Sequence, residues 1–272
     1  MNQILCSTGA LIGKPNGRNY RLLEESAAKL DCDGFEFMMF DSWYDEADEV
    51  VSYMKGIGLN IPVMHCEKHI GEAISRGADG DLEDALLKFE ENCRVAEKIG
   101  ADRLVIHLWD GMTSDSNFAN NLSAYARLHD TAVRYNVDLL VENVVCNQKD
   151  PMTHWCELAR EYPGIHFIFD TKMAAFHEQL SLIYESEYAW LWDGHIRHLH
   201  INDYGGAYKD WANLKTLPIG DGHIDFAEFF HFIKKRDYKG DYTVEATAFD
   251  RKSGEIDYDI LNRCFSTIRR YL

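Results

Sequence analysis

Eight short runs rich in β-branched and aromatic residues recur along the chain, and longer segments with helical periodicity separate them. The runs are ILCSTG, GFEFMMF, IPVMHC, RLVIHLW, DLLVENV, HFIFDT, RHLHIND and YTVEAT. Eight alternating units in 272 residues favour a closed (β/α)8 TIM barrel over an open doubly wound sheet. No G-x-G-x-x-G follows the first run, which disfavours a dinucleotide-binding fold. We therefore predict one α/β domain, a single barrel spanning residues 1–272.

Two of the separating segments carry clear helical patterns. In DLEDALLKFEENCRVAEKIG, apolar residues recur at helical spacing from Leu82 to Ala96, and Gly100 can end the helix in the left-handed conformation. In NFANNLSAYARLHDTAVRYN, we expect a packing stripe of Phe118, Leu122, Tyr125, His129 and Val133, with His129 as a surface or packing residue.

The composition narrows the classes of partner. A net charge of -17 opposes binding to phosphate backbones, so nucleic acid is a poor candidate. The apolar run ILCSTGALI is too short to span a bilayer and lacks a preceding cationic region, so we expect a cytoplasmic protein with no membrane segment. Seven scattered cysteines without a C-x-x-C pair are typical of reduced thiols. A homo-oligomer is compatible with all of these features.

Six consecutive predicted strands each carry a His, Asp or Glu late in the run. These residues are His65, His107, Glu142, Asp170, His200 and Glu245. Because the carboxyl ends of the strands of a TIM barrel meet at the face that holds the active site, we expect these six side chains to gather there. Buried carboxylates cost several kcal/mol unless they are paired, hydrogen-bonded or bound to a cation. A divalent metal ion is the simplest partner, and structural salt bridging is the alternative.

Imidazole and carboxylate ligands without thiolate suit Mn, Mg, Co, Fe or Zn, and we take Mn or Zn as the leading candidates. His65 and His107 can join Glu142 around a second ion, or they can hydrogen-bond the hydroxyl groups of a substrate. We favour the second interpretation of these two histidines.

Other polar and aromatic residues follow the same strands. In IRHLHINDY, His198 is expected to be a hydrogen-bonded interior histidine, whereas Asn202 and Asp203 can contact substrate or ligand side chains at the rim. If the sixth strand continues past Asp170, Lys172 shares its face and can bind a substrate phosphate or carboxylate; a solvated lysine is the alternative. Trp109 can cover a sugar ring, as can Tyr204, Tyr208 and Trp211, although ordinary loop packing explains all four.

The ordered set LLVEN, IFDT, HLHIND, PIGDGHIDF and TVEAT resembles the xylose-isomerase-like TIM-barrel superfamily, which comprises sugar isomerases and epimerases and also endonuclease IV. In PIGDGHIDF, Asp225 is expected to cap the helix that follows. The resemblance implies that Glu142, Asp170, His200 and Glu245 hold one divalent ion. It also implies that the two glutamates act as acid and base on the carbon beside a carbonyl, while the ion stabilises the enediolate oxygen. Members often carry a His three residues after the strand-six Asp, where this chain has Met173, so that His is absent or replaced; His177 is expected to be a helix residue.

The resulting prediction is a metal-dependent sugar or keto-polyol isomerase or epimerase that acts on a small carbohydrate. Several alternatives remain open. One is a dehydratase of a keto-inositol-like substrate, which uses the same opening step. Another is an endonuclease IV-like phosphodiesterase, although the strand-six His and the Asp-x-His pair after strand seven are missing. The others are a Schiff-base aldolase acting through Lys172 and a non-catalytic metal- or sugar-binding barrel.

Overall fold

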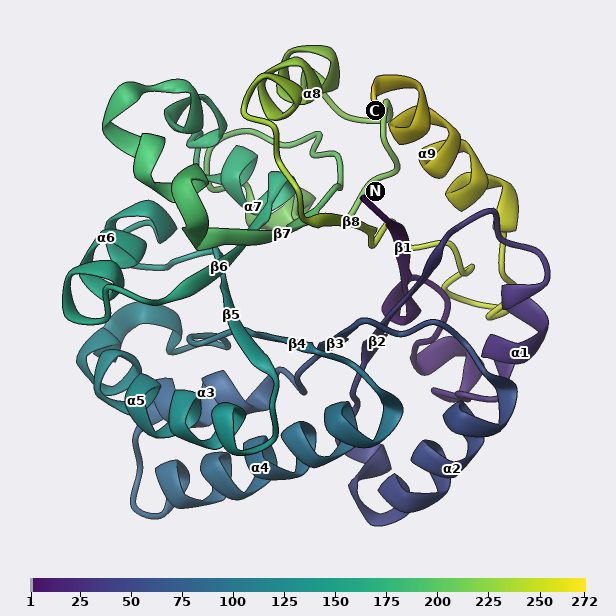
Figure 1. Ribbon diagram of the computed structural model, residues 1–272, viewed down its shortest axis with the longest axis horizontal. Helices are drawn as coiled ribbons and strands as arrows, with labels where there is room; N and C mark the ends of the chain where they lie inside the picture. Colours follow the sequence, from purple (N-terminus) through teal and green to yellow (C-terminus); the bar gives the residue numbers. More distant parts are fainter. Residues whose placement is uncertain (1) are drawn as a thin grey trace. The chain divides into compact units, whose positions relative to one another are not determined.

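Eight parallel strands alternate with helices in the computed structural model, which describes residues 2–272 (Figure 1). The strands are β1 (Ile4–Ser7), β2 (Gly34–Met38), β3 (Val63–His65), β4 (Arg103–Ile106), β5 (Asp138–Glu142), β6 (His166–Asp170), β7 (Ile196–His200) and β8 (Asp241–Val244). Their order is that of a closed barrel, from β1 to β8 in chain order. The predicted (β/α)8 barrel is therefore confirmed.

Helices follow the strands along the chain, as the alternating pattern predicts. They are α1 (Leu22–Ala27), α2 (Ala47–Ile57), α3 (His69–Arg76), α4 (Asp81–Ile99), α5 (Phe118–Arg134), α6 (Pro151–Glu161), α7 (Thr171–Phe176), α8 (Phe226–Lys235) and α9 (Tyr258–Tyr271). Among residues 2–272, no helix combines the length and apolar character needed to cross a membrane. All seven cysteines, which lie within these residues, are free thiols, as expected.

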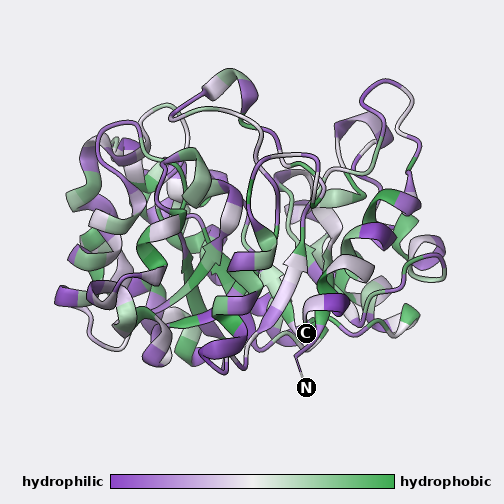
Figure 2. Cartoon of the chain, turned by 90° about the horizontal axis from the view of Figure 1, so that it is seen from above, coloured by the Kyte–Doolittle hydropathy of each residue, from purple (hydrophilic) through white to green (hydrophobic). Residues whose placement is uncertain are grey.

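The chain divides into two compact units, residues 37–168 and residues 1–36 together with 169–272. The single domain over residues 1–272 stays a prediction. The strands of both units are mainly hydrophobic, and hydrophilic residues are concentrated on the outer helices and loops (Figure 2). Burial of these apolar strands supplies the main driving force for folding in each unit.

In the unit of residues 37–168, helices α3, α4 and α5 lie outside β3, β4 and β5 (Figure 1). Gly71 of α3 lies against the end of β4, because a Cβ atom at this position would be 1.9 Å from the carbonyl oxygen of His107. Only glycine permits this close approach of helix to strand, and the contact fixes the backbone that carries His107.

The two predicted helical patterns have different outcomes. For α4 the prediction is confirmed: Phe89, Cys93 and Ala96 are buried, and Gly100 ends the helix with φ 88°. For α5 the stripe is wrong in its second half, since His129 and Val133 are exposed. The buried face instead includes Asn121, Ala124, Leu128 and Thr131. Polar Asn121 is drawn inward because its amide donates to the carbonyl oxygen of Leu108 and to Ser75 Oγ.

In the unit of residues 1–36 and 169–272, strands β7, β8, β1 and β2 pair in that order. Asp225 caps α8 by accepting a hydrogen bond from the backbone N–H of Glu228 at 2.9 Å, as predicted. Strand β6 ends at Asp170, where α7 begins at once. The sixth strand therefore does not continue to Lys172, because Asp170 Oδ1 accepts from the backbone N–H of Met173 at 2.8 Å and caps α7.

Candidate functional site

Three of the predicted site residues meet in the unit of residues 37–168. We call His65, His107 and Glu142, at the ends of β3, β4 and β5, the Glu142 cluster. The Nε2 atoms of His65 and His107 lie 3.3 Å and 2.9 Å from Glu142 Oε2, and all three side chains are buried. Their ligand atoms lie close enough together to hold a metal ion.

The outer nitrogen of each histidine in the Glu142 cluster has its own partner. His65 Nδ1 lies 2.8 Å from the carbonyl oxygen of Cys66, which can only accept, so Nδ1 carries a proton. His107 Nδ1 lies 2.6 Å from Asp110 Oδ2. Burial lowers the pKa of His107, but the carboxylates of Glu142 and Asp110 outweigh that effect and raise it to about 9. Near neutral pH the His107 imidazole is therefore a cation, and its Nε2 forms an ion pair with Glu142 Oε2.

Three further predicted residues meet in the other unit. We call Asp170, His200 and Glu245, at the ends of β6, β7 and β8, the His200 site. His200 Nδ1 lies 3.4 Å from Glu245 Oε2 and 3.9 Å from Asp170 Oδ2. Asn202 joins the two carboxylates, because its Nδ2 donates to Asp170 Oδ2 at 3.0 Å and to Glu245 Oε2 at 3.1 Å. Its Oδ1 also accepts from the backbone N–H of Glu245 at 2.9 Å.

The donor atoms of the His200 site fit a divalent metal ion. Asp170, His200 and Glu245 each offer one ligand atom, and these atoms lie within 4.8 Å of one another. Two carboxylates facing the same imidazole nitrogen would repel each other in a buried site unless a cation lay between them. Oxygen and imidazole donors of this kind suit Mn, Zn and related ions.

Glu36 of β2 is a buried residue that the sequence interpretation missed. His200 Nε2 lies 2.9 Å and 3.0 Å from its two carboxylate oxygens, and His198 Nε2 lies 3.1 Å from Oε2. Thr243 Oγ1 donates to the same Oε2 at 2.9 Å. We call Glu36, His198, His200 and Thr243 the Glu36 cluster. Burial would raise the pKa of Glu36, but the imidazoles of His200 and His198 outweigh it and hold that pKa well below its usual value.

A charged residue inside the apolar run GFEFMMF is the signal that could have pointed to Glu36. His198 was correctly predicted as a hydrogen-bonded interior histidine, since it is fully buried and contacts Glu36 and Thr243.

Asp203 holds the loop that follows β7. Its two carboxylate oxygens accept hydrogen bonds from four backbone N–H groups, those of Tyr204, Gly220, Gly222 and Ile224, at 2.8–3.1 Å. The carboxylate is fully buried. This geometry supports a role in shaping the PIGDGHIDF loop, whereas contact between Asp203 and substrate stays a prediction.

Lys172 and Trp109 are both buried. Lys172 of α7 donates from Nζ to Thr216 Oγ1 at 3.0 Å and lies 3.9 Å from Asp170 Oδ2, so it is not a solvated lysine. Trp109 donates from Nε1 to the carbonyl oxygen of Val144 at 3.1 Å and packs edge-on against Phe118. Its side chain is fully buried, which matches the loop-packing interpretation rather than a cover for a sugar ring.

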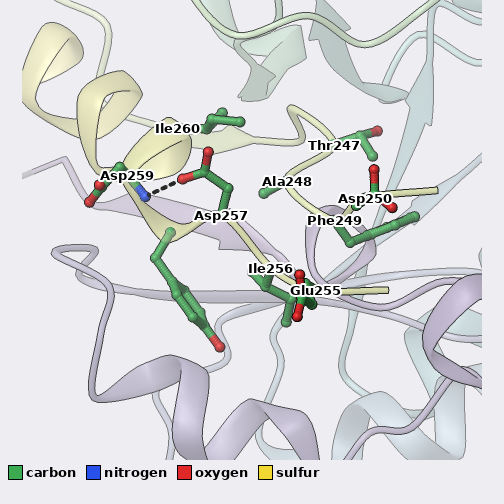
Figure 3. Close-up of a pocket in the computed structure, with 10 residues that line it drawn as sticks. Thr247, Ala248, Phe249, Asp250, Glu255, Ile256, Asp257, Asp259 and Ile260 are labelled. Atoms are coloured by element: carbon green, nitrogen blue, oxygen red, sulfur yellow. Dashed lines mark hydrogen bonds between the residues drawn. The ribbon is translucent and has the colours of Figure 1, made fainter. Parts of the chain in front are cut away.

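A separate pocket of about 630 Å³ lies in the segment that follows β8 (Figure 3). Its lining includes the acidic residues Asp250, Glu255, Asp257 and Asp259. Asp257 caps α9 by accepting from the backbone N–H of Asp259 at 3.1 Å. No residue of the Glu142 cluster, the His200 site or the Glu36 cluster lines it, so this pocket is distinct from all three.

Comparisons with known proteins give the same fold. No curated protein sequence matches the chain. The solved structure of D-allulose 3-epimerase from Methylomonas sp. is 16% identical over 100% of this chain and 97% of that chain, with a TM-score of 0.71. D-psicose 3-epimerase from Clostridium cellulolyticum H10 is 14% identical over 99% of both chains, with a TM-score of 0.71. The 3-keto-D-glucoside 4-epimerase from E. coli is 16% identical over 99% of this chain and 100% of that chain, with a TM-score of 0.66.

The family model described as xylose isomerase-like TIM barrel matches residues 25–259, which is most of the chain. Its range includes β2 to β8 and every residue of the Glu142 cluster, the Glu36 cluster and the His200 site. The resemblance inferred from the motifs is therefore confirmed, and the protein belongs to the xylose isomerase-like TIM barrel family.

Proposed function

We propose that the protein is a divalent-metal-dependent isomerase or epimerase of a sugar or keto-polyol. The observation that carries the proposal is the convergence of Asp170, Glu245 and the Nδ1 atom of His200, with Asn202 bridging the two carboxylates. The solved structures with the same fold include epimerases of allulose, psicose and a 3-keto-glucoside, all small carbohydrates.

Glu142 is the fourth proposed ligand. In the pairing of β5 with β6, Glu142 lies opposite Ile168, and Asp170 follows two residues later on the same face of β6. The strand order then continues to β7, which carries His200, and to β8, after which Glu245 follows. This strand order supports the proposal that Glu142, Asp170, His200 and Glu245 act together, since TIM-barrel active sites lie at the carboxyl ends of the strands.

The bound ion and the two glutamates would have different roles in the proposed reaction. When bound, the ion would polarise the carbonyl group of the substrate and stabilise negative charge on its oxygen. Glu142 and Glu245 would remove and return a proton at the carbon beside that carbonyl. Positioned general bases of this kind typically contribute about 10²–10⁴-fold to the rate. His107 Nε2 forms an ion pair with Glu142 Oε2 at 2.9 Å, which favours the carboxylate form that a base requires.

The test is turnover of a panel of ketoses and keto-polyols in D₂O by the Mn²⁺-loaded protein, with deuterium at the exchanged carbon measured by mass spectrometry. Glu142→Gln and Glu245→Gln should each lower turnover about 10²–10⁴-fold. Glu157→Gln is the matched control. It removes a carboxylate of α6 that pairs with Lys149, and it should leave turnover unchanged.

Full activity of a metal-free protein, unaltered turnover in both glutamine variants, or turnover without deuterium exchange would contradict the proposal. Loss of water from the product would identify a dehydratase, because dehydration of a keto-polyol begins with the same proton removal. The identity of the ion, a second ion at the Glu142 cluster, a homo-oligomer and a cytoplasmic location stay predictions.

A further inference from the structure

Glu36 reaches His200 across the inner face of four strands. Glu36 lies on β2 and His200 on β7, and β1 and β8 lie between these strands in the sheet. Both side chains are fully buried. A contact between non-neighbouring strands requires both side chains to point inward, so Glu36 faces the interior that holds the His200 site.

The hydrogen-bond partners of His200 determine which of its nitrogens carries the proton. An ionised carboxylate only accepts hydrogen bonds, and Nε2 lies 2.9 Å and 3.0 Å from the two oxygens of Glu36. These contacts are shorter than the 3.4 Å from Nδ1 to Glu245 Oε2, so the proton of a neutral His200 lies on Nε2 and the lone pair lies on Nδ1. That lone pair points to the side where Glu245 Oε2 and Asp170 Oδ2 lie 3.4 Å and 3.9 Å away.

The Glu36 cluster is better described as a hydrogen-bond network than as a metal site. Glu36, His198 and His200 have ligand atoms close enough to hold an ion. However, Glu36 Oε2 already accepts hydrogen bonds from Nε2 of His200, Nε2 of His198 and the hydroxyl group of Thr243. The protons of these donors occupy the space in which a cation would have to sit. The donors also hold the Glu36 carboxylate in one orientation.

We propose that Glu36 is a positioning residue that holds His200 as the Nε2–H tautomer, so that Nδ1 is the atom available to a divalent cation at the His200 site. A carboxylate behind a ligating imidazole is a general means of fixing the tautomer and ring orientation and of raising ligand basicity. The assignment of the cation rests on the proposed function, whereas the tautomer follows from the contacts of Glu36 alone.

Two measurements test this inference. The first is the ¹⁵N NMR spectrum of the His200 ring in the metal-free protein, titrated until the ring is neutral. The second is the Mn²⁺ dissociation constant, measured by the electron paramagnetic resonance signal of free Mn²⁺. In wild type we expect the Nε2–H tautomer. In Glu36→Gln, the side-chain amide can donate to Nε2, so we expect a shift toward the Nδ1–H tautomer and an affinity for Mn²⁺ that is about 10–100-fold weaker.

Glu157→Gln is the matched control, because it makes the same carboxylate-to-amide change at a residue of α6 that pairs with Lys149. It should keep the wild-type tautomer and change the dissociation constant by less than about threefold, well below the loss expected on removing a carboxylate partner. A wild-type neutral ring that carries its proton on Nδ1 would overturn the inference even if Glu36→Gln fails to fold. So would a folded Glu36→Gln protein with unchanged tautomer and affinity. A wild type that takes up no Mn²⁺ would contradict the proposed function, and the NMR result would still decide the role of Glu36.

Discussion

The Glu142 cluster and the Glu36 cluster each contain one buried glutamate and two histidines, but the two glutamates have different proposed roles. In each, two histidines direct their Nε2 atoms at one buried glutamate. In the Glu142 cluster, the glutamate is itself a proposed ligand and base. In the Glu36 cluster, the glutamate lies behind His200, and the opposite nitrogen of that histidine faces Asp170 and Glu245.

This difference shows that the partner of one imidazole nitrogen determines what the other nitrogen can do. His107 has a carboxylate at each nitrogen, Asp110 and Glu142, within 2.9 Å, so it is stabilised as a cation and can only donate. His200 has its nearest carboxylate at Nε2, where both oxygens of Glu36 lie within 3.0 Å, whereas Glu245 Oε2 lies 3.4 Å from Nδ1. Its Nδ1 is therefore suited to bind a cation, whereas His107 is suited to hold a carboxylate in place.

The largest expected effect is on Mn²⁺ affinity, to which the Glu36 cluster and the Glu142 cluster should contribute differently through their histidines. His200→Gln should weaken Mn²⁺ binding about 100-fold or more, because it removes a proposed ligand together with the proton partner of Glu36. His107→Gln should weaken it by less than about tenfold, since the glutamine amide can still donate to Glu142. Isothermal titration calorimetry measures both constants. Equal losses in the two variants would show that His107 is a ligand as well, as a second ion at the Glu142 cluster requires.

A third buried carboxylate–imidazole pair, Asp115 and His154, contains none of the proposed metal ligands and provides a comparison. Asp115 accepts from the backbone N–H groups of residues 147–149 and from His154 Nε2 at 2.7–3.0 Å. Asp115→Asn should lower the free energy of unfolding by about 2 kcal/mol, because the amide turns a donor toward these N–H groups. Urea denaturation measures this change. We expect Mn²⁺ affinity to be unaltered, and a weakened affinity would count against a purely structural role.

The Asp115–His154 pair should make the free energy of unfolding depend on pH. Burial raises the pKa of Asp115, but the backbone N–H of Gln148, the side chain of His154 and the backbone N–H of Lys149 outweigh it and lower the pKa to about 2. The unfolded value is about 3.9, so this contribution is complete above that pH and is lost as the pH falls toward 2. Asp115→Asn should therefore differ most from wild type at neutral pH and least in acid.

The smallest expected effect concerns Asp110, whose carboxylate lies beside His107 Nδ1 as that of Glu36 lies beside His200 Nε2. Asp110→Asn should lower the pKa of His107 from about 9, because one of the two carboxylates that raise it is removed. NMR titration of the His107 ring measures this change. Mn²⁺ affinity should change by less than about threefold, in contrast to the 10–100-fold expected where a carboxylate supports a ligating histidine. A larger change would show that the two clusters are functionally equivalent.

The sequence alone was sufficient to predict the barrel, because eight alternating units leave few other arrangements for a parallel sheet. It also predicted that six His, Asp and Glu residues lie late in their strands. In the structure four strands end at His65, Glu142, Asp170 and His200, and His107 and Glu245 follow the other two strands by one residue. These predictions depend on local patterns, since strand periodicity and the common direction of parallel strands determine where such side chains emerge.

Only the tertiary structure decided the roles that depend on distant partners. Glu36 lies 164 residues from His200 in the chain, and no local pattern relates the two. Packing likewise buries Trp109. The carboxylate of Asp203 accepts hydrogen bonds from the backbone N–H groups of a folded loop. A side chain's residue type is set by the sequence, but the proton it carries and the atom it exposes depend on its neighbours in space. Those neighbours are brought together only when the strands assemble.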